Sequence, residues 1–407
     1  MSNKLIQGTL IFTFAAVLTA GLNFLFYTLG RFIGPEDFGV LVSLLSLSFV
    51  ISIAQTVVFN VVTKVVATHK LSSKQVEQHL LKILLIAQIL LAISFILLGT
   101  IFLRSYLNIS DITPFAMLAL LALSSLFLAM YRGILRGSMS FADTAITQII
   151  ESVLKLIFAV TAIALGLGIN GILFGLAVGS LITLIVAKLL STRLTVSEKE
   201  VDVLEVFSIK SVTAVSIGFI VINLMFIVDG VMARSSLAAY DAGIYGAVIT
   251  FGKLVFFLAG SISIALFPIS ASGNGSLKDL KQSLIISSGI GLFATIAFAF
   301  LGTFLVQSVF GLEFIEAASY LAMQTVIMTI FVLANNIVLY LISRDYNKIN
   351  PFLFLSLLMQ IGLIHYFGNS IAAVLNIQMV VMSFLFLISV YFLLTFRREQ
   401  KADQYTK

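Results

Sequence analysis

Long apolar runs separated by short polar segments constrain this chain more than any other feature. Each run is long enough to cross a hydrocarbon layer of ~30 Å, which takes about 20 helical residues. Only 10% of the residues are charged and 60% are hydrophobic, whereas a soluble domain carries roughly 25% charged residues. The sequence therefore predicts an all-α integral membrane protein with about 12 transmembrane helices. The runs lie at about 9–30, 38–63, 80–103, 113–133, 143–166, 170–190, 209–230, 242–268, 283–308, 317–342, 351–367 and 371–396.

The distribution of Lys and Arg predicts the topology. The apolar stretch from Lys4 to Gly30 exceeds the ~7–15 residues of a signal-peptide core, so we expect it to be the first span. If the N-terminus is cytoplasmic and the sides alternate, nineteen of the 24 Lys and Arg residues fall in cytoplasmic segments. This bias follows the positive-inside rule and predicts that both termini are cytoplasmic. Three lie on the opposite side, namely Arg31, Arg104 and Arg234. The remaining two, Lys155 and Lys253, lie inside predicted spans.

An internal repeat suggests two halves. The segment Asp37-Phe38-Gly39-Val40 and the segment Asp241-Ala242-Gly243-Ile244 share the pattern Asp-x-Gly-aliphatic, about 204 residues apart. Each follows an outward-going span, and an even number of spans between copies preserves their direction. A chance match is the alternative. The sequence thus predicts an N-terminal six-helix lobe at 1–196, a cytoplasmic linker at 197–208, a C-terminal six-helix lobe at 209–396 and a cytoplasmic tail at 397–407. The linker is either a short interfacial helix or a solvated loop.

Composition and motifs exclude several classes of function. Because the chain has no Cys, disulfides, thiolate chemistry and Cys-ligated metals are excluded. The three His residues, His69, His79 and His365, are too scattered to suggest a metal site. The turn Gly273-Asn274-Gly275 lacks the Lys-Ser/Thr of a phosphate-binding loop. We therefore expect no metal and no cofactor, no binding of nucleic acid, and energy from an ion gradient or a substrate gradient rather than from ATP.

Several segments resemble a known family. The run Tyr27-x-x-Gly30-Arg31-x-x-Gly34-Pro35-Glu36-Asp37-Phe38-Gly39 resembles the first-hairpin signature of bacterial polysaccharide biosynthesis proteins. These are lipid-linked oligosaccharide flippases, of the O-antigen translocase type, in the multidrug/oligosaccharidyl-lipid/polysaccharide exporter superfamily. The segment Tyr131–Gly137, followed by Phe141, Glu151 and Lys155, is similar to that family's connection between spans 4 and 5. Asp241-x-Gly243-x-Tyr245 and Pro268 also match.

The resemblance implies a fold and a function. It implies two six-helix lobes that form a V around a central cavity and transport by alternating access. The substrate would be an undecaprenyl-pyrophosphate-linked oligosaccharide, such as the repeat unit of a lipopolysaccharide O-antigen, a capsule or an exopolysaccharide. The location would be the bacterial inner membrane, with membrane lipids, a coupling H+ or Na+ and other polysaccharide assembly proteins as partners.

Two ionisable residues in the fifth predicted span are candidates for the site. Glu151 and Lys155 lie ~12 Å and ~18 Å from the cytoplasmic end of the helix, where charges are costly and usually functional. They share a polar stripe with Gln148. One interpretation is a structural ion pair, because the spacing i,i+4 favours one. The other is that Lys155 meets an anionic headgroup while Glu151 modulates its charge or takes a coupling cation.

The second half offers a matching cation. Lys253 lies ~16 Å from the external end of its span, so each half supplies one lysine at middle depth. Two cations at a shared cavity suit a pyrophosphate-linked glycan. Asp229, near the external mouth, is a second candidate for the coupling ion. Three further residues complete the predicted substrate site, although interhelical hydrogen bonds use the same residue types: Arg31, Asn23 and Gln55.

Two other functions compete with this one. A cation-coupled multidrug antiporter of the same superfamily would place carboxylates in the cavity, whereas the deep charges here are mostly lysines. A membrane glycan polymerase or polyprenyl-linked glycosyltransferase would carry a large external loop or a soluble catalytic domain. The longest predicted external loop has only about a dozen residues. We therefore expect a transporter that is not an enzyme.

Overall fold

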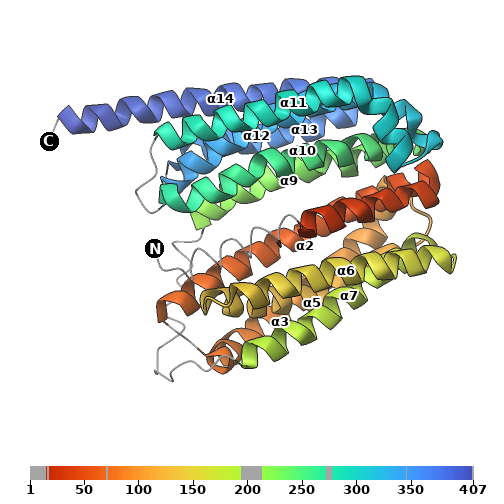
Figure 1. Ribbon diagram of the computed structural model, residues 1–407, viewed down its shortest axis with the longest axis horizontal. Coiled ribbons are helices and arrows are strands. Elements are labelled where there is room, and N and C mark those ends of the chain that lie inside the picture. Colours follow the sequence, from red (N-terminus) through yellow and green to blue (C-terminus); the bar gives the residue numbers. More distant parts are fainter. Residues whose placement is uncertain are drawn as a thin grey trace. The chain divides into compact units, whose positions relative to one another are not determined.

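The computed structural model describes residues 15, 18–69, 72–193, 213–271, 277–344 and 346–405, and the regular elements of these residues are all helices (Figure 1). Eleven of these helices are long and apolar enough to cross a membrane. The predicted first span falls partly outside the described residues, and its described part is helical at 18–28. The prediction of an all-α, multi-pass membrane protein is confirmed.

The chain divides into two compact units. The first unit holds Met1–Ile33 and Leu44–Ile209, and the second holds Gly34–Ser43 and Lys210–Lys407. The predicted linker at 197–208 and the predicted turn at 273–275 lie outside the described residues.

The first unit is a bundle in which α5 is central. It packs against α3 and α7, and α7 in turn packs against α6. The buried core of this unit includes Val62 of α2 together with Leu128 and Met130 of α5. Helix α3 continues through a π-helical turn, where Gly99 packs directly on the ring of Phe115. The elements are η1 (Leu29–Phe32), α2 (Gly34–His69), α3 (Ser73–Leu98), η2 (Gly99–Leu103), α4 (Arg104–Tyr106), α5 (Thr113–Gly137), α6 (Phe141–Ala164) and α7 (Gly168–Thr192).

The second unit is built around α12. This helix packs against α10, α11 and α14, while α9 packs against α13. The last helix continues past the predicted end of the twelfth span at residue 396 and reaches Tyr405. The elements are α9 (Thr213–Ser236), α10 (Ala239–Ala271), α11 (Leu277–Val309), η4 (Leu312–Tyr320), α12 (Leu321–Ser343), η5 (Asn347–Ile349), α13 (Asn350–Phe367) and α14 (Ile371–Tyr405).

The two copies of the Asp-x-Gly repeat meet at their glycines. A Cβ atom on Gly39 would lie 2.9 Å from the backbone nitrogen of Gly243, and one on Gly243 would overlap the carbonyl oxygen of Pro35. Only glycine allows backbones to approach this closely. The ring of Phe38 also packs against Phe310, with ring centroids 5.3 Å apart. These contacts explain why the first residues of α2 belong to the second unit.

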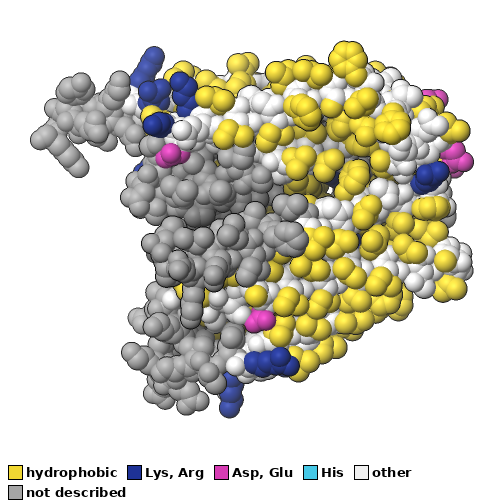
Figure 2. Space-filling model, in the orientation of Figure 1, with side chains coloured by type: hydrophobic (Ala, Val, Ile, Leu, Met, Phe, Trp, Pro, Cys, Tyr) yellow, Lys and Arg dark blue, Asp and Glu magenta, His cyan; other side chains and the backbone are white. Residues whose placement is uncertain are grey.

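The outer faces of the helices are apolar. On α11 the side chains of Phe293 and Phe300 are 74% and 84% exposed. Figure 2 shows hydrophobic side chains over most of the visible described surface, with most of the charged side chains toward the helix ends. Large exposed apolar patches are rare on soluble monomers, and here they form the surface that lipid chains would cover.

Candidate functional site

Each unit contains a polar cluster with ionisable residues within its membrane-spanning helices. The first-unit cluster consists of Asn23, Arg132, Thr147, Glu151 and Lys155. The second-unit cluster consists of Asp229, Tyr245, Lys253, Gln360 and Gln378.

Lys155 lies on α6 and is held by neutral partners. Its ammonium donates a hydrogen bond to Oδ1 of Asn23 at 3.0 Å and lies 4.3 Å from the ring centroid of Phe26. Both partners come from the helical residues 18–28. A cation over an aromatic face is stabilised by the ring quadrupole, more so away from water. The structure thus brings together Lys155 and Asn23, two residues that the sequence predicted for one site.

Glu151 pairs with an arginine rather than with Lys155. Its Oε2 lies 2.7 Å from Nη1 of Arg132. The same guanidinium donates from Nε to Oγ1 of Thr147 at 3.1 Å and from Nη2 to the carbonyl oxygen of Thr147 at 2.8 Å. The sequence-based interpretation as an ion pair within α6 is therefore wrong. The reason is that the end of α5 brings in a planar cation that binds the carboxylate and the α6 backbone together.

The burial pattern of α6 agrees with the predicted polar stripe. Thr144 and Ser152 are buried, and Gln148 is half-buried on the same face. On the other side of the helix Ile146 and Ile157 are 45% and 52% exposed. The stripe therefore faces the interior of the first unit, and the apolar side faces outward.

Two further predicted residues lie outside the first-unit cluster. Gln55 donates from Nε2 to the carbonyl oxygen of Ser125 at 3.3 Å, which ties α2 to α5. This contact favours the structural interpretation of Gln55. Arg31 is exposed in η1.

Asp229 on α9 is buried, with 1% of its surface exposed. Its Oδ2 accepts a hydrogen bond from the hydroxyl of Tyr245 at 3.1 Å, and its Oδ1 accepts one from the backbone N–H of Gly230 at 2.8 Å. Its charge also interacts with that of Lys253. The sequence placed Asp229 near the external mouth of its span, and in the structure α10 packs against α9 and covers the carboxylate with Tyr245.

Lys253 is buried within the second unit. It is 6% exposed, and its ammonium lies 5.4 Å from the ring centroid of Phe226. The positive charge of Lys253 and the negative charge of Asp229 compensate each other. The second-unit cluster is therefore neutral overall when both groups are ionised.

Two glutamines that the sequence analysis missed complete the second-unit cluster. Gln360 on α13 donates from Nε2 to Oε1 of Gln378 at 3.0 Å and to the carbonyl oxygen of Met225 at 3.1 Å. Gln378 on α14 adjoins the hydroxyl of Tyr245. The signal was one isolated Gln inside each of the last two apolar runs, where an uncharged amide must find partners inside the bundle.

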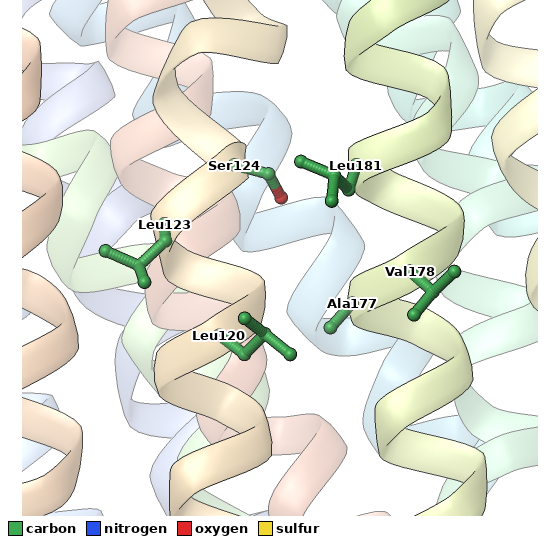
Figure 3. A pocket seen from close by; sticks show the side chains of 6 residues that line it. All are labelled: Leu120, Leu123, Ser124, Ala177, Val178 and Leu181. Atoms are coloured by element: carbon green, nitrogen blue, oxygen red, sulfur yellow. The ribbon is translucent and has the colours of Figure 1, made fainter.

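A small pocket on the first unit is a different kind of site. It lies between α5 and α7, and Figure 3 shows the side chains that line it. The lining is almost wholly apolar, and its one polar group, Ser124, donates to Ser180 at 2.9 Å. Such a surface suits a lipid chain rather than a sugar. The lining residues are Leu120, Leu123, Ser124, Ala177, Val178 and Leu181.

Residues 5–273 match the family described as "Polysaccharide biosynthesis protein". The chain belongs to this family. It is also 25% identical over 306 residues to the uncharacterized membrane protein MJ1375 of Methanocaldococcus jannaschii, a match that covers 69% of this chain and 71% of that protein.

Two solved structures show the fold. One is the inward-facing conformation of a multidrug resistance MATE family transporter of the MOP superfamily, with a TM-score of 0.73, 15% identity and 96% of both chains covered. The other is the lipid II flippase MurJ in an inward closed conformation, with a TM-score of 0.70, 12% identity, and 95% of this chain and 87% of that chain covered. The family and the fold predicted from the sequence are confirmed.

Proposed function

We propose that this protein is a flippase that moves an undecaprenyl-pyrophosphate-linked oligosaccharide across the bacterial inner membrane by alternating access. The cargo would be the repeat unit of an O-antigen, a capsule or an exopolysaccharide. Membership of the polysaccharide biosynthesis family and the shared fold with a lipid flippase support the proposal. The observation that carries it is the position of Lys155, a cation among membrane-spanning helices whose hydrogen-bond partner is a neutral amide.

The first-unit cluster carries one excess positive charge. Arg132 and Lys155 are each positive and Glu151 is negative, and Glu151 is paired with Arg132. A charge at membrane depth is costly unless an opposite charge or a polar cavity accompanies it. A pyrophosphate group would supply that opposite charge. Asn23 would release the ammonium to the phosphate, or would bind the substrate together with it.

Asp229 is the first candidate for the residue that binds the coupling ion. Glu151 is the weaker candidate because its carboxylate already holds a guanidinium. A proton on Asp229 would leave the charge of Lys253 uncompensated, and this would favour the binding of an anion. Protonation of Asp229 would therefore couple the proton gradient to substrate binding through the pair Asp229 and Lys253. Na+ at the same carboxylate would have to compete with the ammonium of Lys253.

The test in cells is the leaflet distribution of the lipid-linked glycan. Deletion of the gene should cause the glycan to accumulate in the cytoplasmic leaflet, and expression of the wild-type chain should reverse this. Complementation with Lys155→Gln should fail at an equal protein level in the membrane. An unchanged leaflet distribution after deletion would contradict the proposal.

A cation-coupled multidrug antiporter is the second candidate. The observation that favours it is the buried carboxylate Asp229, because the antiporter would need such a group to bind cations. This function predicts that deletion raises sensitivity to cationic dyes and slows their efflux. The flippase predicts that dye efflux is unchanged while the glycan accumulates.

A further inference from the structure

The segment Tyr131–Gly137 fixes the position of one arginine. A Cβ atom on Gly133 would lie 2.8 Å from Cβ of Val62, and one on Gly137 would lie 2.8 Å from the carbonyl oxygen of Thr63. The end of α5 therefore packs on α2 with no room for side chains at these two positions. Arg132 lies next to this contact, so its backbone cannot shift without separating the two helices.

The side chain of Arg132 is fixed as well. Three of its nitrogens bind α6, one the carboxylate of Glu151 and two the hydroxyl and carbonyl of Thr147. The side chain of Arg132 is 13% exposed and that of Glu151 is 31% exposed. Because its nitrogens already bind α6, the guanidinium is a poor candidate for direct contact with a substrate.

Without Arg132, Glu151 would have another partner available. Glu followed by Lys at i,i+4 is the favourable order for an ion pair on a helix, and the charges of Glu151 and Lys155 already interact. The carboxylate would then neutralise the ammonium that the proposed function needs. The presence of Arg132 therefore determines that the negative charge of Glu151 compensates Arg132 and not Lys155.

We propose that Arg132 is a positioning residue that holds Glu151 away from Lys155, so that Lys155 stays available to a phosphate group of the lipid-linked substrate. This inference rests on the proposed function. The Tyr131–Gly137 segment would then do more than pack its glycines against α2, because its arginine would help the site to select an anionic substrate.

The experiment compares two probes that share the lipid chain and differ in the pyrophosphate headgroup. Purified protein in lipid nanodiscs is titrated with undecaprenyl pyrophosphate and with uncharged undecaprenol. Arg132→Gln should weaken binding of the pyrophosphate by at least about tenfold, which corresponds to about 1.4 kcal/mol. Binding of undecaprenol should stay within about twofold, because it has no phosphate for Lys155 to bind, whereas misfolded protein would lose both ligands.

Two further variants separate positioning from packing. Arg132→Lys keeps a cation for Glu151 and should retain pyrophosphate binding within about threefold. The double variant Arg132→Gln with Glu151→Gln removes both charges of the pair, and it should regain most of the affinity that Arg132→Gln loses. A double variant as weak as Arg132→Gln, or a lysine variant as weak as the glutamine variant, would overturn the inference.

A fourth variant shows which proposal has failed. If Lys155→Gln binds pyrophosphate as tightly as the wild type, the proposed substrate site is wrong, and the inference about Arg132 is wrong with it. If Lys155→Gln is weak while Arg132→Gln binds like the wild type, only the inference about Arg132 is wrong. Loss of undecaprenol binding in Arg132→Gln would show that the arginine is structural.

Discussion

Replacing Lys155 by Gln removes the excess positive charge of the first-unit cluster. The ammonium lies 3.0 Å from Oδ1 of Asn23, and glutamine keeps an N–H donor on a side chain that is one bond shorter. The substitution therefore removes the charge while a polar donor remains. The perturbation acts on charge more than on packing.

The magnitude follows from the contact that Lys155 would make with a phosphate. A hydrogen bond to a charged group contributes about 1.5–3 kcal/mol, which corresponds to roughly 10- to 150-fold in affinity. Purified Lys155→Gln in proteoliposomes should therefore lose roughly 10- to 150-fold in transport at a substrate concentration below saturation. Lys155→Arg keeps the charge with a different shape and should lose less.

A matched control uses another lysine of the first unit. Lys188 has a side chain that is 53% exposed, and its ammonium lies 3.9 Å from the carboxylate of Glu77. Lys188→Gln removes the same charge at the surface, where ion pairs contribute little, and it should transport like the wild type. Wild-type transport by Lys155→Gln at a normal folded yield would refute the assignment of Lys155 to the substrate site.

Two other substitutions test the second unit. Asp229→Asn removes the negative charge beside Tyr245 and should abolish the dependence of transport on the proton gradient while folded protein remains. An imposed pH step across proteoliposomes measures this dependence. Transport that still follows the gradient would exclude Asp229 as the coupling group. Gly243→Ala places a methyl group against the carbonyl oxygen of Pro35, so it should lower the free energy of unfolding by about 1–3 kcal/mol, seen as a lower midpoint in thermal unfolding in detergent. Gly289→Ala, where a Cβ atom meets nothing within 4 Å, is the control and should not lower that midpoint.

The helices could be predicted from the sequence because each span follows from its own length and apolarity. A run of ~20 apolar residues has no other stable form in lipid. The polar stripe on α6 was predictable for the same reason, since the helical period alone places Thr144, Gln148, Glu151 and Ser152 on one face.

The partner of Glu151 could not be predicted, because it depends on how two helices pack. The local spacing rule favoured Lys155, and the pairing with Arg132 arises only when the end of α5 lies against α6. The burial of Asp229 has the same origin, since Tyr245 covers it from the next helix. Contacts within one helix are encoded locally, whereas contacts between helices require the fold.

The close contact between Gly39 and Gly243 lies between these two cases. The repeat was visible in the sequence as Asp-x-Gly-aliphatic, but similarity between two segments does not predict that they are in contact. The structure places the two glycines in contact within the second unit. The pattern thus marks a packing requirement at these positions.

The most direct test of the account is a flipping assay with purified components. The protein is reconstituted into liposomes that contain a fluorescent undecaprenyl-pyrophosphate-linked oligosaccharide, and a reagent that cannot cross the membrane quenches the outer leaflet. The account predicts that the wild-type protein makes the inner-leaflet pool accessible to the quencher, and that Lys155→Gln does so at least about tenfold more slowly. A protected inner-leaflet pool in the presence of folded wild-type protein and an imposed proton gradient would contradict it.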